Sequence, residues 1–320
     1  MAIVANTFLH YTAKGIREDL ADVIANISPE ETPFQSNIGT VDVTNTTFEW
    51  QTDSLAAASA TARISGDDVA SFDATTATTR LSNVTQILRR TMVIEDNLDF
   101  VDKAGRDSEV AYQAAKKGKE LKRDVETMLC GVNNAKVTGN STTAPETASL
   151  SAWIATNTNK ATAGSPADPT GDGTDARTDG TQRAFTEAML KDVVQKVWNA
   201  GGDPTMVMVG SFNKQAVSGF AGIAAQRYMA PGDGPTTIIG AADIYMSDFG
   251  EMSIVANRFS RSRDAYVIDP EYVAVGVLRP IQMVDLAKTG DAEKRMAICE
   301  SGLMVKNEAA HGIIADLTTS

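Results

Sequence analysis

The amino-acid sequence predicts an α+β fold, in which one long helix, several short buried strands and one long strand pair come from separate parts of the chain. Small and apolar residues recur with helical spacing over residues 98–130. The run TMVMVGS at 205–211 begins a series of short apolar strands separated by polar turns. Two longer strands flank a polar turn within residues 279–306. Helices and strands that occupy separate stretches in this way are typical of α+β proteins.

The bulk properties of the chain exclude several classes of protein. Its 320 residues suffice for one large domain or two smaller ones with a substantial core. The net charge of −12 argues against a protein that mainly grips DNA or RNA, because neutralising phosphates requires an excess of Arg and Lys. Cys130 and Cys299 form neither a disulfide framework nor a zinc pattern, which favours a reducing compartment. Without a signal peptide or an apolar run of ~20 residues, we expect a cytosolic protein with no membrane segment.

An amphipathic helix is predicted for residues 12–28, followed by a loop that starts at Pro29. A helix this short must dock either on its own core or on a neighbouring molecule. Its apolar side chains share one face: Ile16, Leu20, Val23, Ile24 and Ile27.

Residues 46–94 are predicted to form two long strands joined by a poorly packed tip around residues 65–72. The stretch is rich in Thr, Ser and Ala, with few large apolar groups in its first half. Apolar residues alternate at Phe48 and Trp50 and again over residues 81–94. Because a two-stranded hairpin is not stable by itself in water, we expect this one to lie on another subunit.

The helix predicted for residues 98–130 is the strongest element and would be roughly 50 Å long at 1.5 Å per residue. Lys116 and Glu120, and likewise Lys122 and Glu126, are one turn apart and are predicted to lie on the solvent-exposed side. The buried side is predicted to comprise Val101, Ala104, Ala111, Ala114, Ala115, Gly118, Leu121, Val125, Met128 and Leu129.

Residues 133–180 are predicted to form a flexible surface insertion, because Thr, Gly, Asp, Asn and Pro dominate them and leave little to bury. Regular structure resumes with an amphipathic helix over residues 185–198. The remaining predicted elements are a buried strand at 205–211, a short helix at 213–222, strands within 241–247, 251–257 and 263–278, and the long strand pair of 279–306 around a turn at 289–290.

The polar run AKTGDAEK at 287–294 looks like a Lys-Thr-Gly loop of an active site, but its partners are missing. A lactam-binding loop needs an S-x-x-K nucleophile at a helix start, and a phosphate loop needs G-x-x-x-x-G-K-[ST]. Neither is found. We therefore interpret this run as a hairpin turn centred on Gly290.

Two other candidates for ligand binding lie within the predicted insertion. GDGTDA at 171–176 imitates a dinucleotide motif, but it follows no predicted strand and opens no predicted helix. Asp168, Asp172, Asp175 and Asp179 fit the twelve-residue calcium loop only in part. A flexible acidic loop is therefore favoured over a bound cation.

No motif nominates a catalytic residue, a cofactor or a metal site. His10 and His311 are the two histidines, too few for most metal sites, and the G-x-S-x-G motif of a Ser-His-Asp hydrolase is absent. We interpret His311 as either a packed or a surface side chain. Carboxylates are plentiful, so an enzyme with an unrecognised carboxylate site stays open as an alternative.

Arg258, Arg261 and Arg263 cluster in the run NRFSRSRD at 257–264. Such a cluster forms a solvated turn, a salt-bridge patch between subunits or a weak phosphate contact. Because the chain is otherwise acidic, we favour salt bridges between subunits.

A family resemblance rests on six runs: KGIREDLADVIANISPEETPFQSNIG (14–39), EWQTDSLA (49–56), KGKELKRDVETML (117–129), SDFG (247–250), ANRFSRSRDAYVIDPEYVAVGVLRP (256–280) and LAKTGDAEK (286–294). In this order they resemble the major capsid proteins of tailed phages, most strongly those of short-tailed phages with the Hong Kong 97-type capsid fold. The resemblance extends from about residue 8 to residue 317 and weakens over 133–180. No single run is diagnostic, but the ordered set is specific.

The resemblance implies a division of the chain into the parts of that fold. These are an N-arm at 1–45, an E-loop at 46–94, the P-domain spine helix at 95–132, the insertion at 133–180, an A-domain at 181–278, the P-domain strand pair at 279–306 and a return to the A-domain at 307–320. Around Gly290, the resemblance implies salt bridges between capsomers by Lys288, Asp291, Glu293 and Lys294. Further candidates for contacts between subunits are Arg63, Asp67 and Asp68 in the E-loop, besides the three arginines of 257–264.

The implied function is self-assembly, through pentamers and hexamers, into the icosahedral head of a phage that encloses double-stranded DNA without sequence-specific binding. The implied location is the virion, after assembly in the host bacterial cytoplasm. The implied partners are further copies of the chain, a portal and, as open options, separate scaffolding and decoration proteins. An encapsulin-like bacterial compartment is the main alternative, and the match over the arm and the E-loop argues against it.

Two departures from the family refine this expectation. Some relatives cross-link an E-loop lysine to an asparagine of a neighbour, but residues 46–94 contain no lysine. We therefore expect a shell held by non-covalent contacts. The chain also starts directly in the predicted arm, so a scaffold is expected to be a separate protein or already removed.

Overall fold

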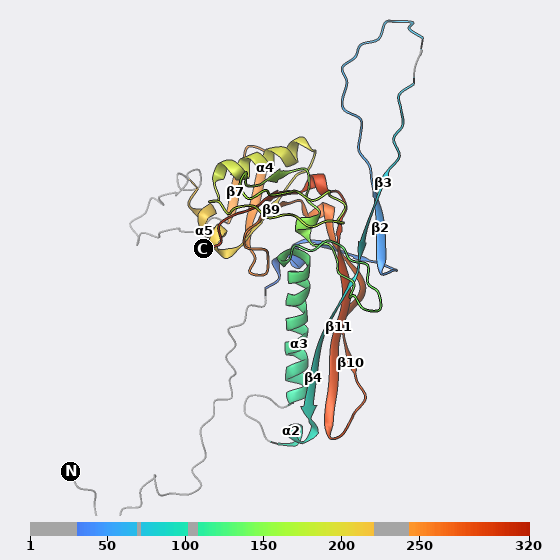
Figure 1. Ribbon diagram of the computed structural model, residues 1–320, viewed down its shortest axis with the longest axis vertical. Helices are drawn as coiled ribbons and strands as arrows, with labels where there is room; N and C mark the ends of the chain where they lie inside the picture. The colour runs from blue at the N-terminus through green and yellow to red at the C-terminus, as the bar shows by residue number, and fades with distance from the viewer. Residues whose placement is uncertain (1–30, 69–71, 102–107, 221–242) are drawn as a thin grey trace, which may run out of the picture.

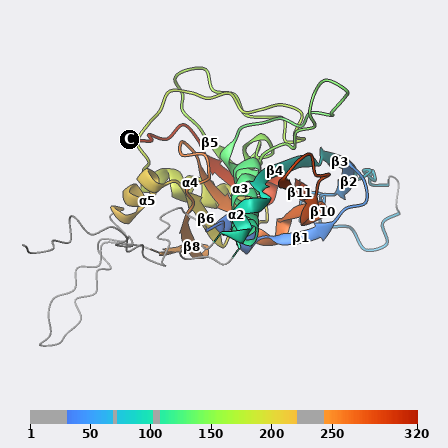
Figure 2. The same cartoon turned by 90° about the horizontal axis from the view of Figure 1, so that it is seen from below.

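A computed structural model describes residues 31–68, 72–101, 108–220 and 243–320 (Figure 1). A four-stranded sheet and a long helix form an arm, with a six-stranded sheet beside its upper end. A two-stranded hairpin projects away from the arm (Figure 1). The loops of residues 133–180 lie on one side of the sheets in the view from below (Figure 2). The helix predicted for residues 12–28 falls outside the described residues.

The sheet of the arm contains the predicted long strand pair. One edge strand, residues 86–95, turns alternate side chains toward the long helix. Its Arg90 bonds to Asp124 of the helix, and its Met92 packs with Val110 of the helix. Gly290 lies in the turn of the strand pair with a φ of +87°, as its predicted role requires. In sheet order the strands are β1 (Gly39–Asp42), β10 (Val273–Asp285), β11 (Ala292–Val305) and β4 (Gln86–Glu95), with β1 parallel to β10 and the others antiparallel.

The long helix is shorter than the predicted span of 98–130. A separate short helix, α2 (Asp96–Phe100), precedes it. The long helix α3 (Glu109–Glu126) begins after Ser108, whose Oγ accepts a hydrogen bond from Ala111 N at 3.2 Å. Ser is a favourable residue at this position because its oxygen satisfies a free backbone N–H. The helix is therefore about 27 Å long, and it continues into the π-helical turn η1 (Thr127–Gly131).

The predicted faces of this helix need correction. Leu121 and Val125 are buried as predicted, but Ala111 and Ala115 are exposed. Glu126, which was predicted to lie on the exposed side, has no accessible surface. The buried face of α3 includes two acids, Glu109 and Glu126, which a stripe drawn through small and apolar residues leaves out.

The six-stranded sheet carries the predicted strands and helices of the second half of the chain. Helices α4 (Glu187–Asn199) and α5 (Ser211–Ser218) cover one face of it, and all residues of its two central strands are buried. Its opposite face contributes Met206, Met208 and Tyr266 to the main core. In sheet order the strands are β5 (Thr158–Asn159), β12 (Gly312–Ile314), β9 (Ala265–Ile268), β6 (Met206–Val209), β8 (Gly250–Ala256) and β7 (Ile244–Ser247).

A short run within residues 133–180 is part of the main core, so the prediction of a surface insertion with little to bury is wrong for this run. Leu150, Trp153 and Ile154 have no accessible surface and pack in the core that both sheets share. The short run ASLSAWI at 148–154 supplies these side chains, and it contains the turn η2 (Leu150–Ala152). The polar composition of the whole segment hides this run, because an average over the segment is dominated by its loops.

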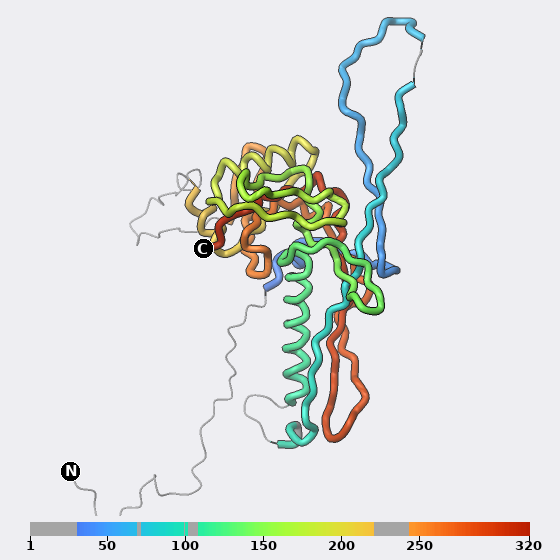
Figure 3. Tube along the Cα trace, viewed as in Figure 1, coloured from blue at the N-terminus to red at the C-terminus, as the bar shows by residue number. Residues whose placement is uncertain are grey.

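The predicted hairpin is present, but its strands are short. Only β2 (Thr47–Thr52) and β3 (Thr79–Val84) pair with each other, and the described parts of residues 53–78 contain neither helix nor strand. At Thr85 the chain passes directly from β3 into β4, which belongs to the arm (Figure 3). The second long strand predicted for residues 81–94 is therefore two strands in two sheets.

The base of the hairpin is fixed on the strand pair by an aromatic side chain. Phe48 is buried, and its ring stacks on Trp50 at a centroid distance of 5.8 Å. The same ring covers Gly276 and Gly302, where a Cβ would lie 3.3 Å and 2.9 Å from its carbon atoms. These two glycines give Phe48 the space that it fills, since protein cores are closely packed.

Three short helices complete the described chain: α1 (Pro33–Asn37), η3 (Pro270–Tyr272) and η4 (Glu308–Ala310). No helix within the described residues has the length and apolar character needed to cross a membrane.

His311 precedes β12 and is a packed side chain without accessible surface. Its Nδ1 accepts a hydrogen bond from Asp269 N at 3.3 Å, and its Nε2 lies 3.4 Å from the carbonyl oxygen of Tyr272. This pairing assigns the proton of the neutral ring to Nε2. Burial lowers the pKa of His311 to about 4.

We expect His311 to make the fold sensitive to acid. The unfolded chain takes up a proton near pH 6.5, whereas the folded chain does so only near pH 4. The free energy of unfolding should therefore fall as the pH drops through this window, by about 3 kcal/mol in total. His311→Gln should lack this component, and urea unfolding of both proteins at pH 7.5 and pH 4.5 measures the difference. An equal fall in the two proteins would contradict the assignment.

Candidate functional site

The predicted contact residues lie at three separate places in the fold. Arg63, Asp67 and Asp68 belong to the hairpin, and the charged residues around Gly290 lie at the far end of the arm (Figure 1). The three arginines follow β8 in the loop that leads to β9. The fold does not bring these three groups together within one subunit.

The hairpin exposes apolar and charged side chains together. Leu55 is 99% exposed, Ile64 82% and Phe72 89%. Arg63 and Asp67 are exposed beside them. Large apolar side chains on a segment without its own core favour a surface that contacts another molecule.

The charged residues at the end of the arm also have partners within the chain. Lys288 Nζ lies 2.7 Å from Asp96 Oδ2, and the hydrogen bond from this carboxylate raises the pKa of Lys288. Lys294 bonds to the hydroxyl of Thr289, and Glu293 to Arg295. These contacts join the turn of the strand pair to α2 and leave its charged groups at the surface.

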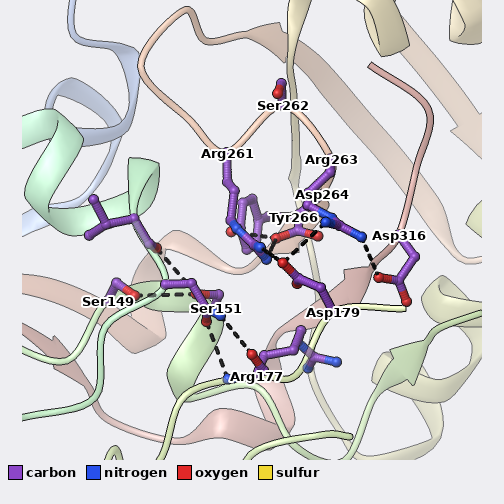
Figure 4. A network of polar contacts seen from close by, with 12 residues as sticks. Ser149, Ser151, Arg177, Asp179, Arg261, Ser262, Arg263, Asp264, Tyr266 and Asp316 are labelled. Atoms are coloured by element: carbon purple, nitrogen blue, oxygen red, sulfur yellow. Dashed lines mark hydrogen bonds and ion pairs between the residues drawn. The ribbon is translucent and has the colours of Figure 1, made fainter. Parts of the chain in front are cut away.

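Arg261 and Arg263 form an ionic network within the subunit (Figure 4). Arg261 Nη1 lies 2.8 Å from Asp264 Oδ2, and its Nη2 pairs with Asp179. Arg263 reaches the same Asp179 at 3.1 Å and Asp316 at 3.0 Å. The two arginine side chains are only 13% and 22% exposed and pair with acids of their own subunit, which argues against the predicted salt bridges between subunits for both. Arg258 is exposed, and its contact role stays a prediction.

Asp316 connects the network to the backbone of residues 133–180. Its Oδ1 accepts a hydrogen bond from Gly180 N at 2.6 Å, and its Oδ2 accepts one from Ala161 N at 3.1 Å. Asp316 itself has a φ of +62°, a left-handed conformation that only a few residue types tolerate. The carboxylate of Asp316 therefore holds two loop segments, at Ala161 and at Gly180, against the segment that follows β12.

The aspartates weighed as calcium ligands have other partners. Asp168 pairs with Lys160 at 2.6 Å and with Arg177, whose side chain is 1% exposed. Burial acts to raise the pKa of Asp168, but bonds from Lys160 and Arg177 lower it overall. Asp172 and Asp175 accept hydrogen bonds from threonines of their own loop. Within the described ranges, no group of three or more His, Cys, Asp or Glu residues is placed to hold a metal ion.

Asp264 is the most deeply buried acid of the network and has no accessible surface. Burial raises its pKa, and the adjacent Arg261 opposes this effect. The guanidinium of Arg261 therefore compensates a charge that would otherwise be costly to bury. This network joins segments far apart in sequence. We call it the clamp; its members are Asp179, Arg261, Arg263, Asp264 and Asp316.

The sequence indicated the arginines of this clamp but not their acids. Arg261 pairs with Asp179 from 82 residues away, and Arg263 with Asp316 from 53 residues away. Arg261 and Asp264 are the first and last residues of a turn closed by the hydrogen bond from Asp264 N to the carbonyl oxygen of Arg261, so alternation along an extended segment does not explain the network. Nothing in the sequence identifies which of the many aspartates lies opposite.

The pattern of the SU10 major capsid protein family matches residues 3–318 of this sequence. The chain belongs to this family. It is also 28% identical over 338 residues to the major capsid protein of Escherichia phage Phieco32, covering 96% of each protein. The protein is thus a major capsid protein of a tailed phage and forms the icosahedral head, in place of the encapsulin-like and enzyme alternatives.

Solved capsid structures share the fold of this capsid protein. The cyanophage A-1(L) capsid is similar with a TM-score of 0.70 and 12% identity, over 97% of this chain and 100% of that one. The protein of Gordonia phage Cozz gives a TM-score of 0.60 at 13% identity, over 98% and 99%. The predicted Hong Kong 97-type capsid fold is confirmed.

Asp179→Asn should loosen the clamp without unfolding the capsid protein. The change leaves two largely buried guanidinium groups with one carboxylate fewer, which should cost about 1–3 kcal/mol. Hydrogen exchange should rise in residues 160–183 and stay unchanged in β6 and β9. Asp175→Asn, the same change at a residue that bonds to Thr170 in its own loop, is the control. Equal exchange in the two variants would refute the clamp.

Gly290→Ala should destabilise the turn of the arm through its backbone alone. A Cβ at this position meets no atom within 4 Å, so the cost is that of a positive φ, about 1–2 kcal/mol. Gly39→Ala is the matched control, because a Cβ there also meets nothing and its φ is not positive. Urea unfolding of the unassembled subunits measures both, and a change of similar size in the two would argue against a strained turn.

Proposed function

We propose that the capsid protein assembles by laying its hairpin on a neighbouring copy, and that pentamers and hexamers of such copies close the head. The observation that carries this proposal is the exposure of Leu55, Ile64 and Phe72 on a segment with two short strands. A ribbon of this kind needs another surface to hold it. Many weak contacts per subunit become strong together in a closed shell.

The proposed shell is held by non-covalent contacts. Residues 46–94 contain no lysine, so the hairpin cannot supply the amine of a Lys–Asn cross-link. Exposed charged side chains form the contacts between subunits instead, whereas Arg261 and Arg263 form ion pairs within their own subunit. The proposed contact residues are Arg63, Asp67, Asp68, Arg258, Lys288, Asp291, Glu293 and Lys294.

We assign the parts of the capsid fold with two changes from the sequence-based division. The E-loop ends at residue 85 rather than 94, because β4 pairs with β11 in the arm. Residues 133–180 are assigned to the core next to the A-domain. The other parts keep their ranges: the N-arm at 1–45, the spine helix within 95–132, the A-domain at 181–278, the P-domain strand pair at 279–306 and the return at 307–320.

We further propose that the shell encloses double-stranded DNA without sequence-specific binding. The net charge of −12 supports this, since an acidic wall does not hold a polyanion. Assembly in the host bacterial cytoplasm and a portal at one vertex complete the proposal. A phage G structure of similar fold contains gp26 decoration proteins beside the gp27 major capsid proteins, so decoration is a further option for this shell.

Deleting residues 60–75 should abolish shell formation and leave the two sheets folded. The deletion removes the exposed end of the hairpin, and β2 and β3 remain paired at its base. Light scattering and negative-stain microscopy should show megadalton shells for the wild-type chain and free subunits or small oligomers for the variant. A Ser59→Ala/Thr61→Ala variant, altered in two polar side chains of the same hairpin, is the control. Normal shells from the deletion variant would refute the role of the hairpin.

A further inference from the structure

Glu126 is a buried acid that joins three parts of the subunit. It is the last residue of α3 and has no accessible surface. Its Oε1 accepts hydrogen bonds from Phe34 N and from Asn257 Nδ2, both at 2.7 Å. Its Oε2 accepts one from Gln35 N at 3.0 Å.

On one side, Glu126 holds the short helix α1. The residue before α1, Thr32, makes no side-chain hydrogen bond to the helix, and the free N–H groups of Phe34 and Gln35 point to Glu126 instead. Gln35 Nε2 also donates to the carbonyl of Lys122 at 2.9 Å. Phe34 is fully buried in the main core. These contacts attach the chain at residues 34–35 to the last turns of α3.

On the other side, Glu126 reaches the six-stranded sheet. Asn257 follows β8, and its backbone N–H donates to Val209 in β6 at 2.9 Å. Its side chain contributes one of the two hydrogen bonds at Glu126 Oε1. The π-helical turn η1 begins at the residue after Glu126, and such turns often mark functional positions.

The chemistry of this junction requires a carboxylate. All three donors are neutral amide groups, and between them they use both oxygens of Glu126. A glutamine of the same shape offers one oxygen and one NH2 group. Its NH2 would face at least one N–H group, so one buried donor would lose its acceptor.

We propose that Glu126 is a positioning residue for assembly: it fixes α1 against the end of α3, and it holds the arm at a set angle to the six-stranded sheet. This inference rests on the proposed function, because its second readout is the shape of the shell. The residue acts through α1 and Asn257 and requires no contact with a neighbour.

The test compares Glu126→Gln with Glu120→Gln. The control makes the same change on the same helix, at a residue paired with Lys117 near the surface. Chymotrypsin reports the junction directly, because Phe34 is buried while Phe72 is 89% exposed and serves as the internal reference. In the unassembled Glu126→Gln subunit, cleavage after Phe34 relative to Phe72 should rise at least tenfold. In microscopy, the fraction of shells with the wild-type diameter should fall by at least half.

A relative cleavage rate within twofold of that of Glu120→Gln, or shells of wild-type diameter, would overturn the proposal. If Glu126→Gln does not fold, Asn257→Ala replaces it, because this change removes one donor and keeps the acceptor. Cleavage after Phe34 should then rise about threefold, and no rise would contradict the proposal. If the wild-type chain forms no shell even when it is co-expressed with a scaffolding protein, the proposed function fails, and the protease comparison still decides the role of Glu126.

Discussion

The antiparallel ladder between β10 and β11 is the interaction on which the rest of the subunit depends. β10 starts buried in the main core and ends exposed in the arm, and β11 runs the opposite way. The ladder joins Val273 to Val305 at the core and Asp285 to Arg295 in the arm. The register of the ladder shifts on both sides of Arg279. Irregularities of this kind bend a strand and increase its twist. Because β4 pairs with β11 and α3 packs against β4, β11 and β10, the rest of the arm is held together by this pair.

Local patterns were sufficient to predict the elements whose burial repeats within a few residues. The helix α4 and the strand β6 follow from apolar spacing, and Gly290 marked the turn of the strand pair because a positive φ favours glycine. The division between hairpin and arm at Thr85 was missed, since β3 and β4 form one continuous extended run of sequence. Local pattern cannot tell which sheet each half of such a run will join.

The polar part of the structure was much harder to predict from sequence. The composition of residues 133–180 concealed Trp153, whose ring lies 5.3 Å from that of Trp50 in the core. Arg261 was noticed, but Asp179 could be recognised as its partner only in the folded chain. Lys122, one turn before Glu126, predicts an exposed position for this acid, whereas the fold buries it. In each case the deciding contact joins residues far apart in sequence, where spacing carries no information.

The fit of Phe48 over Gly276 and Gly302 has a consequence for how related shells can differ. The ring fixes the base of the hairpin, so bending is confined to the chain beyond Thr52 and Thr79. Insertions or deletions there would leave the ladder and both cores untouched. The length of the hairpin can thus change while its base keeps the same place on the folded subunit.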